Sequence, residues 1–335
     1  MLIHPGVAII GAGVAGLAAA RMLAPQVETV LFEKSRGVGG RLACRRAGDF
    51  SFDFGAQYFT VRDPLFRAEI ARLQEAGIVK PWHCRFAEFR DGHIDSLQYW
   101  GSAEAHFVGA GRMTAVASAW AEGLRIVLRT KIESIRPSAS GWILESDDQT
   151  EFGPFAAVIL AIPAPQAASL IPPSSTLLRS AQEARMQACF ALMLGFETLP
   201  DFGFDAARID GDCLGWLAFS RSRPGNSSPP GLVVQSRNDW AERNLEAPRD
   251  WIIEDMRWEL NRVLGRELAP VHVDLHRWRF AACGAAADEA PLLDPEAGLA
   301  LCGDWTVDGR IEAAYLSGVR VGAAMLSLQG RARNL

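Results

Sequence analysis

Apolar and polar residues follow a clear order at the two ends of the chain. A β-branched run at residues 7–10 predicts a buried parallel strand, the Ala-rich stretch 14–23 predicts a helix, and residues 29–33 predict a second strand. These three elements have the size of a βαβ unit. Near the other end, residues 299–302 predict a short strand, and residues 313–328 predict a final helix.

The middle of the chain has a less regular pattern, in which helices are easier to place than strands. Residues 64–76 predict an amphipathic helix with Pro near its start and Gly77 at its end, and residues 113–121 and 250–264 predict two more. Strand-like runs occupy residues 125–129, 132–136, 142–145, 157–162, 189–196, 213–219 and 232–235. Residues 220–231 contain three Pro, two Gly and five Ser or Asn, which predicts a mobile loop.

This order of elements predicts an α/β fold with two domains. A Rossmann-type nucleotide-binding domain would be built from both chain ends, with residues 1–62, 102–165 and 290–335. An inserted α+β domain for the substrate would contain residues 63–101 and 166–289. A ligand-binding cleft is expected between the two lobes.

Composition narrows the class of protein. The chain has 335 residues, of which 49% are hydrophobic, and a net charge of -5 without a long run of either sign, so nothing indicates nucleic-acid binding. The six cysteines are scattered without a C-x-x-C pair, which indicates buried thiols in a reducing compartment. The apolar stretch 7–24 lacks the preceding basic residues of a signal peptide, and no other stretch resembles a membrane span. We therefore expect a cytoplasmic protein without membrane contact.

The first motif is the glycine-rich segment Gly11-x-Gly13-x-x-Gly16. The first glycine permits a tight turn, the second lets the backbone approach a pyrophosphate, and the third lets helix and strand pack closely. The pyrophosphate would lie at the helix N-terminus, where free N–H groups favour an anion. Glu33 ends the second strand, so its carboxylate would accept from ribose hydroxyls and disfavour the 2′-phosphate of NADP. This motif predicts a dinucleotide and leaves FAD and NAD both open.

Two further glycine-rich segments favour FAD. Residues 35–41 read SRGVGGR, in which Gly40 offers a backbone donor and Arg41 a guanidinium to the same pyrophosphate. Near the other end, residues 302–318 read CGDWTVDGRIEAAYLSG. Asp304 would bind a ribityl hydroxyl, and the helix that starts near Ile311 would direct its N-terminal amides at the flavin. Two such distant loops suit the long FAD molecule better than NAD.

One alternation has the form of a metal site. His272, Asp274 and His276 share one face of a predicted strand, as ligands in an H-x-D-x-H arrangement would. A solvated strand face is the commoner cause of such alternation, so we expect no metal.

Five segments together resemble the FAD-dependent amine oxidase superfamily. They read GAGVAG, EKSRGVGGR, DFGAQYF, VILAIPAPQ and GDWTVDGRIEAAYLSG. Within that superfamily, the GAQYF block and the HRW tripeptide at residues 276–278 most resemble bacterial renalases, and the resemblance runs over nearly the whole chain. The sequence carries EAAY where relatives more often have EGAW, a departure at Ala313 and Tyr315. The resemblance implies the two-domain fold shared with p-hydroxybenzoate hydroxylase, and FAD as the cofactor.

The resemblance also implies which residues contact the ligands. Ile132 would hold the adenine through backbone groups, while Asp304 and Ile311 would lie at the ribityl chain and the isoalloxazine. With the motif residues, the candidate FAD-binding residues are Gly11, Gly13, Ala15, Gly16, Glu33, Lys34, Gly40, Arg41, Gln57, Tyr58, Ile132, Gly303, Asp304 and Ile311. The candidate residues of the substrate pocket are Tyr58, His276, Trp278, Trp305 and Arg310.

Two features differ from amine oxidases of this superfamily. Many of those enzymes carry a Lys on a substrate-domain strand, whereas residues 186–196 contain none. They also often flank the substrate nitrogen with two aromatic rings, and Arg310 occupies one of those positions. A cation there would repel a protonated amine and attract a phosphate or carboxylate.

The resemblance to renalases implies oxidation of isomeric dihydronicotinamide dinucleotides, with hydride passing to the flavin and oxygen giving hydrogen peroxide. This chemistry depends on stacking of the substrate ring rather than on a nucleophile or base. Two alternatives remain open: an oxidase or desaturase acting on an amine or another small molecule, and a flavin-binding sensor without turnover.

Overall fold

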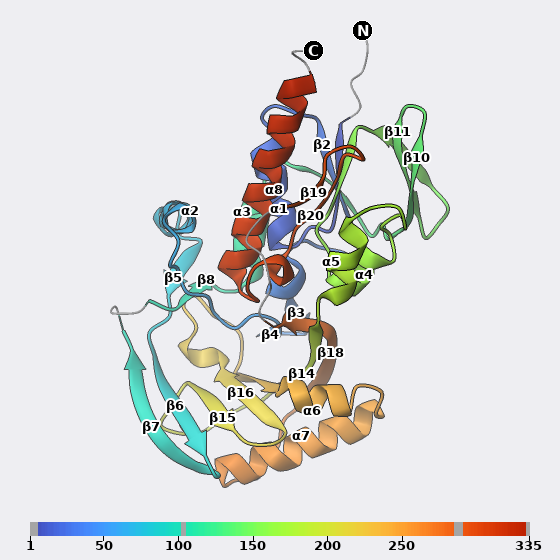
Figure 1. The fold of residues 1–335 in the computed structure, drawn as a ribbon. Helices are drawn as coiled ribbons and strands as arrows, with labels where there is room; N and C mark the ends of the chain where they lie inside the picture. Colours follow the sequence, from blue (N-terminus) through green and yellow to red (C-terminus); the bar gives the residue numbers. More distant parts are fainter. Residues whose placement is uncertain (1–5, 102–104, 285–290, 333–335) are drawn as a thin grey trace. The chain divides into compact units, whose positions relative to one another are not determined.

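The computed structural model describes residues 6–101, 105–284 and 291–332. These residues form two compact units (Figure 1). The first unit comprises Met1–Gly40, Ala117–Met186 and Cys283–Leu335, and the second comprises Arg41–Val116 and Gln187–Ala282. These bounds place residues 41–62 and 105–116 apart from the nucleotide-binding segments with which the sequence analysis grouped them. They place residues 166–186 and 283–284 with those segments instead, whereas residues 285–289 of the predicted substrate domain lie outside the described residues.

The first unit is built on a mostly parallel sheet. Within the described residues the strand order is β19-β20-β13-β1-β2-β9, and only β19 runs antiparallel to its neighbour. The strands are β1 (Val7–Ile10), β2 (Thr29–Glu33), β9 (Arg125–Leu128), β13 (Ala157–Leu160), β19 (Leu292–Asp294) and β20 (Leu299–Leu301). A smaller antiparallel sheet contains β10 (Ile132–Ser138), β11 (Gly141–Ser146) and β12 (Glu151–Phe155), and it shares a core with β1 and β2.

Two helices of the first unit pack closely because glycines line their contact. They are α1 (Val14–Leu23) and α8 (Ile311–Ala332), drawn side by side in Figure 1. A Cβ at Gly318 would come within 2.1 Å of the Ala15 carbonyl oxygen, and one at Gly322 within 2.9 Å of Met22 Cβ. Among the described helices, the stretch Ile311–Leu328 is the one long and apolar enough to cross a membrane, but half of it is buried within the protein. Packing against α1 explains its apolar composition.

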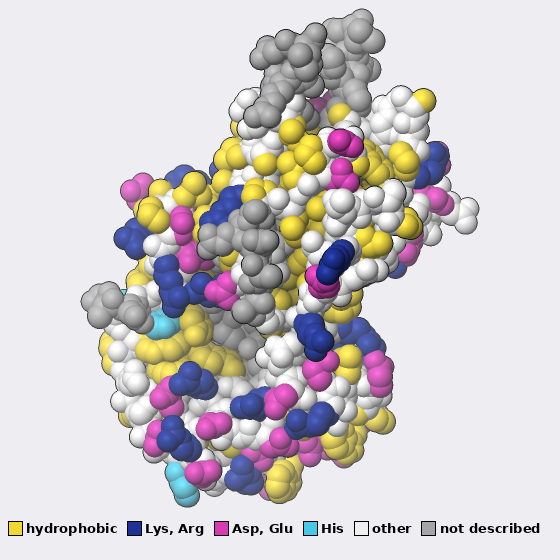
Figure 2. All heavy atoms as spheres, in the orientation of Figure 1, with side chains coloured by type: hydrophobic (Ala, Val, Ile, Leu, Met, Phe, Trp, Pro, Cys, Tyr) yellow, Lys and Arg dark blue, Asp and Glu magenta, His cyan; other side chains and the backbone are white. Residues whose placement is uncertain are grey.

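The second unit is built on a mixed sheet with the order β18-β14-β17-β16-β15-β6-β7 among the described strands. These strands are β6 (Cys84–Arg90), β7 (His93–Trp100), β14 (Met186–Gly195), β15 (Ala206–Asp210), β16 (Leu214–Phe219), β17 (Gly231–Ser236) and β18 (His272–Cys283). The helices α6 (Asn238–Arg243) and α7 (Arg249–Leu264) bury their apolar sides against one face. Figure 2 shows basic and acidic side chains interspersed over the lower part of the view, where Figure 1 draws α6 and α7. Arg243 of α6 forms an exposed ion pair with Asp212 at 2.8 Å.

The other face of this sheet is covered by a hairpin. Its strands are β3 (Cys44–Ala47) and β4 (Phe50–Asp53). Phe52 and Phe54 pack against Ala191, Met193 and Val233 of the sheet. This packing is the physical reason why residues 41–62 fall in the second unit.

The remaining elements are short. They are η1 (Gly40–Leu42), α2 (Pro64–Glu75), β5 (Val79–Pro81), β8 (Phe107–Gly109), α3 (Thr114–Ala121), α4 (Ala164–Ala168), α5 (Leu177–Glu183), η2 (Ser220–Ser222) and η3 (Asp304–Thr306). Local signals set some of their ends: Asp63 caps α2 by accepting from the Leu65 N–H at 2.8 Å, and Gly265 ends α7 at a φ of +62°.

Every helix and strand named in the sequence analysis is present, with ends shifted by a few residues. The sequence analysis did not name β3–β8, β12, β15, β19, or the helices α4, α5 and α6, and it assigned only the first residues of β18 to a strand. The Pro- and Gly-rich segment 220–231 begins with η2 and is anchored by several hydrogen bonds, among them Gly231 N–H to Ser220 Oγ at 2.9 Å.

Candidate functional site

The Gly11–Gly16 loop leaves a space beside the N-terminus of α1. Gly11 has a φ of +104°, which favours glycine, and a Cβ at Gly16 would lie 2.0 Å from the Gly11 carbonyl oxygen. Gly13 differs from both. Its backbone is extended (φ -76°, ψ -176°), and an added Cβ would meet no atom within 4 Å. Because no side chain caps α1, its N–H groups face this space, which fits a pyrophosphate.

Glu33 is held in place by the same loop. Its Oε2 accepts from the Ala12 N–H at 2.9 Å, and its Oε1 accepts from the Ser35 N–H at 2.8 Å. Each carboxylate oxygen keeps a lone pair for a ribose hydroxyl. The Thr130 N–H donates to the Glu33 carbonyl at 3.0 Å, which brings the backbone leading to Ile132 beside the end of β2. The predicted contact of Ile132 with the adenine stays a prediction.

The second glycine segment packs directly on the first. The Gly39 N–H donates to the Ala12 carbonyl at 2.8 Å, and a Cβ at Gly40 would come within 3.4 Å of Gly13 Cα. Lys34 is exposed. Arg41 belongs to the second unit, where its guanidinium donates to the Ala281 carbonyl at 3.1 Å. Its predicted pairing with the pyrophosphate stays a prediction.

The C-terminal motif follows another strand of the same parallel sheet. Gly303 and Asp304 follow β20 after one intervening residue, and Gly11 follows β1 directly, so both segments lie at the carboxyl edge of the sheet. From β20 to β2 is three strand spacings, roughly 14 Å, which suits an extended dinucleotide. The loop is fixed because the Gly303 N–H donates to Ser317 Oγ at 3.1 Å. As predicted, α8 begins at Ile311.

Two predicted substrate residues lie in the first unit, and the structure shows contacts of both with other protein groups. Trp305 is 4% exposed, lies in the core and donates its indole N–H to the Ile162 carbonyl at 3.0 Å. This burial favours a structural role over substrate contact. Arg310 is 40% exposed and pairs with Asp308 at 2.5 Å, so its charge is partly neutralised and its expected attraction for an anion is weakened.

In the second unit, the GAQYF block is fixed by side chains from distant parts of the chain. The Phe54 carbonyl accepts from Trp278 Nε1 at 3.0 Å, and the Gly55 carbonyl accepts from Gln235 Nε2 at 2.6 Å. Gln57 donates its own Nε2 to the Asp53 carbonyl at 2.6 Å. The amide of Gln57 is thus engaged in bracing this loop, whereas the predicted contact of Gln57 with FAD stays a prediction.

His276 and Trp278 form an aromatic group with Phe54. The Trp278 and Phe54 rings stack with centroids 5.2 Å apart, and His276 meets both rings edge-on. Arg45 lies over Phe54 and donates to His276 Nδ1 at 3.4 Å. Burial, followed by the Arg45 guanidinium, lowers the pKa of His276 to about 4, so the imidazole is neutral at pH 7.

Asp274 is paired with two arginines rather than presented to a metal. Arg45 donates to its Oδ2, and Arg249 donates to its Oδ1 at 2.5 Å. Among the described residues, no three His, Cys, Asp or Glu side chains form a group that could hold a metal ion.

We expect acid to destabilise the protein partly through His276. The folded-state pKa of about 4 lies below the unfolded value of 6.5, so between these values only the unfolded state gains the proton. Stability is therefore lost as the pH falls from 6.5 towards 4. Between pH 7 and pH 5 the free energy of unfolding should fall in wild type by about 1 kcal/mol more than in His276→Gln. This value allows for the part of the ring that is exposed to solvent. Urea unfolding at both pH values checks this.

The matched control is His93→Gln, which changes an exposed histidine on β7 and should follow the wild type. An equal loss of stability in His276→Gln and wild type would contradict the assignment.

A second aromatic group was missed by the sequence analysis. Its members are Tyr58, Phe86, Trp100, His106 and Trp216, which we call the aromatic platform. The Tyr58 ring lies 5.0 Å from Trp100 and 5.5 Å from Trp216, measured between centroids. Trp100 stacks on Phe86 at 4.3 Å and on His106 at 3.7 Å. The sequence pattern showed Trp216 only as one apolar residue in a predicted strand.

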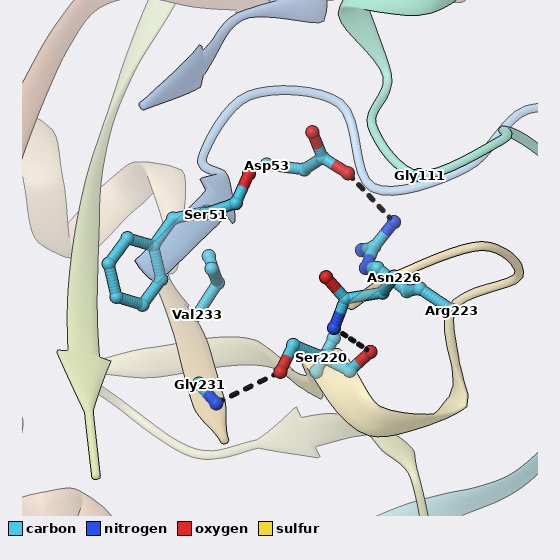
Figure 3. A pocket seen from close by; sticks show the side chains of 10 residues that line it. Ser51, Asp53, Gly111, Ser220, Arg223, Asn226, Gly231 and Val233 are labelled. Carbon is cyan, nitrogen blue, oxygen red and sulfur yellow. Dashed lines mark hydrogen bonds and ion pairs between the residues drawn. The ribbon is translucent and has the colours of Figure 1, made fainter. Parts of the chain in front are cut away.

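A buried ion pair was also missed. Figure 3 shows Asp53 and Arg223 pointing toward each other across a small pocket, with Arg223 Nη1 3.6 Å from Asp53 Oδ2. Their side chains are 6% and 9% exposed. Arg223 Nη2 also donates to Gln57 Oε1 at 2.6 Å, and the guanidinium lies 4.6 Å from the centroid of Trp82. Burial raises the pKa of Asp53, and Arg223 opposes that rise.

The cysteines largely have the environment expected from the sequence. All six are free, and Cys84, Cys189, Cys213 and Cys302 are buried. Burial raises the pKa of Cys189 to about 11 and that of Cys302 to about 12, so these thiols stay protonated and unreactive.

These features define a two-domain flavoprotein of the Rossmann type. They are the parallel sheet, the helix α1 whose N-terminus has no side-chain cap, and the second unit with its mixed sheet. A model described as "Flavin containing amine oxidoreductase" matches residues 83–326, and a model for an NAD(P)-binding Rossmann-like domain matches residues 9–72. The chain therefore belongs to the flavin containing amine oxidoreductase family, and its cofactor is FAD.

Solved structures share this fold at low identity. A protein from Exiguobacterium sp. 255-15, described as a "putative protoporphyrinogen oxidase", superposes with a TM-score of 0.74 at 13% identity, covering 96% of this chain and 98% of that one. Putrescine oxidase bound to putrescine gives 0.74 at 15% identity, covering 97% and 99%, and a double mutant of putrescine oxidase gives 0.75 at 15% identity with the same coverage. At these identities the likeness is one of fold.

Proposed function

We propose that the protein is an FAD-dependent oxidase that takes hydride from isomeric dihydronicotinamide dinucleotides, as renalases do. The balanced reaction converts the dihydronicotinamide, a proton and oxygen into the oxidised nicotinamide and hydrogen peroxide. When bound, FAD supplies the hydride acceptor and passes two electrons to oxygen. The six free cysteines agree with a reducing compartment, and we include a cytoplasmic location in the proposal.

The observation that carries the proposal is the composition of β14. Its ten residues include no Lys, and Cys189 is the one ionisable side chain among them. That thiol has a raised pKa and stays protonated at pH 7. Oxidation of an amine begins with loss of a proton from the ammonium group, which a basic side chain assists. A dihydropyridine needs no such step, because it is neutral and requires only a ring surface against which to stack.

The charges in the second unit also disfavour an ammonium substrate. Asp53 and Asp274, which lie beside the aromatic groups, are each already paired with at least one arginine. His276 is neutral at pH 7. The proposal does not rest on Arg310, since Asp308 partly neutralises its charge.

Anaerobic mixing with NADH isomers tests the proposal. Isomers reduced at ring positions other than C4 should bleach the flavin absorbance rapidly after mixing. When oxygen is then admitted, the absorbance should return, and one hydrogen peroxide molecule should form for each dinucleotide oxidised. Ordinary NADH is the matched control and should react far more slowly. If none of the isomers bleaches the flavin, the proposal is wrong. Peroxide release from benzylamine or polyamines would instead establish amine oxidation, and no turnover with any reductant would indicate a sensor.

A further inference from the structure

The aromatic platform occupies the face of the second unit's sheet that α6 and α7 leave uncovered. Strand pairing sets Arg208 opposite both Glu88 and Trp216, and Ala206 opposite both Phe86 and Ala218, so Phe86 and Trp216 project from the same face. Leu217 and Phe219 alternate with Trp216 and Ala218 along β16 and therefore point to the opposite face, where they belong to the core under the helices. Trp216 and Tyr58 are both only partly buried, whereas Phe86 and Trp100 are buried.

The indole N–H of Trp216 distinguishes this group from ordinary core packing. It is buried and has no hydrogen-bond partner among the described residues. Three indoles elsewhere in the described residues have an acceptor: Trp82 donates to Ser222 Oγ, Trp142 to the Ala297 carbonyl, and Trp278 to the Phe54 carbonyl, at 2.7–3.0 Å. A buried donor without an acceptor is costly, and a ligand that brings an acceptor would remove this cost.

The chemistry of the platform restricts that ligand. An indole N–H only donates, and a phenol hydroxyl both donates and accepts. A flat ring with a carboxamide matches this set, because its carbonyl oxygen accepts while its NH₂ group donates. An ammonium group only donates, so it offers no acceptor to the Trp216 N–H. Burial raises the pKa of Tyr58, and the hydroxyl therefore stays protonated.

We propose that the aromatic platform binds the nicotinamide ring of the substrate, with Trp216 Nε1 donating to the carboxamide oxygen and Tyr58 contacting the ring edge. This inference rests on the proposed function. It assigns to Trp216 the preference for a ring that carries a carboxamide over one that lacks it. Trp216 is thus a specificity-determining residue.

The test uses Trp216→Phe, which keeps an aromatic ring and removes the N–H. The FAD-loaded protein is titrated with nicotinamide mononucleotide and with a pyridine mononucleotide that lacks the carboxamide, and binding is followed by isothermal titration calorimetry. Wild type should prefer the carboxamide ligand about tenfold, as one hydrogen bond allows (about 1.4 kcal/mol). In Trp216→Phe this preference should disappear, while FAD content and Tm stay as in wild type. A ring with a purely structural role would not change the preference between two ligands.

Trp251→Phe is the matched control, because Trp251 lies on α7 and stacks on Trp240, away from the platform. It should keep the preference. If wild type oxidises the isomers but Trp216→Phe keeps the carboxamide preference, the inference is overturned and the proposed function stands. If no isomer reduces the flavin, yet wild type shows a preference that depends on Trp216, the proposed function fails and the platform is supported. If nicotinamide mononucleotide does not bind to wild type, the inference is overturned.

Discussion

Gly13→Ala should yield a folded protein that binds FAD at least ~100-fold more weakly than wild type, or about 2.8 kcal/mol. The reason is that Gly13, unlike Gly16, has free space where a Cβ would be added. The backbone at Gly13 is extended and accepts any residue, and a Cβ there would meet no protein atom within 4 Å. The space it enters is that beside the α1 N-terminus, where the backbone must approach the pyrophosphate. Bound FAD after desalting, and Tm of the apoprotein, measure the two effects separately.

Gly16→Ala should instead lower the stability of the apoprotein. Its Cβ would lie 2.0 Å from the Gly11 carbonyl oxygen, so the apoprotein itself should be destabilised. Gly284→Ala, whose Cβ also meets nothing within 4 Å, should bind FAD and melt as wild type does. Stability of the Gly13→Ala apoprotein should change by no more than about 1 kcal/mol. Normal FAD affinity in Gly13→Ala would contradict the assignment of this space to the pyrophosphate.

The nucleotide-binding loops could be predicted from sequence because their physics is local. Gly11, Gly13 and Gly16 act through a turn and a helix that follow one another directly, and Glu33 lies at the end of the next strand. The apolar runs of β1, β2, β13 and β20 are buried over their whole length, so composition alone identifies them. The same holds for α8, which begins where its motif predicts.

The second unit could not be predicted in this way because its contacts join distant residues. Phe54 and Trp278 are 224 positions apart, and Arg45 and Asp274 are 229 apart. Nothing in the neighbourhood of either partner indicates the other. β7 is an edge strand with Ile94, Leu97 and Tyr99 exposed, so its pattern did not show the alternation of a half-buried strand.

The segment 220–231 shows the limit of reading a loop from composition. Its Pro, Gly and Ser content predicts turns, which the structure contains, and it also suggested mobility. Arg223 lies inside the second unit, where it donates to both the side chain and the backbone carbonyl of Gln57. A buried cation cannot be recognised from the residues beside it in the chain. It depends on Asp53 and Trp82, which come from elsewhere in the fold.

Arg223→Met should therefore destabilise the protein by about 3–5 kcal/mol, since it leaves the carboxylate of Asp53 buried without its partner. The variant also removes two hydrogen bonds to Gln57, which braces the GAQYF block. Urea unfolding of the FAD-loaded protein measures the loss. Arg243→Met is the matched control in the same unit: its pairs with Asp212 and Asp239 are exposed, so it should cost at most about 1 kcal/mol.

The double variant Asp53→Asn, Arg223→Met separates charge from packing. If the uncompensated carboxylate causes most of the loss, the neutral Asn should recover roughly half of it, and the two substitutions will be strongly non-additive. If the double variant is as unstable as the sum of the two single ones, the guanidinium acts mainly through Gln57 and Trp82 instead. A loss in Arg223→Met no greater than in Arg243→Met would show that the pair does not hold the loop. The GAQYF block would then be held by its other hydrogen bonds, among them those from Gln235 and Trp278 and the backbone pair between Phe59 and Phe107.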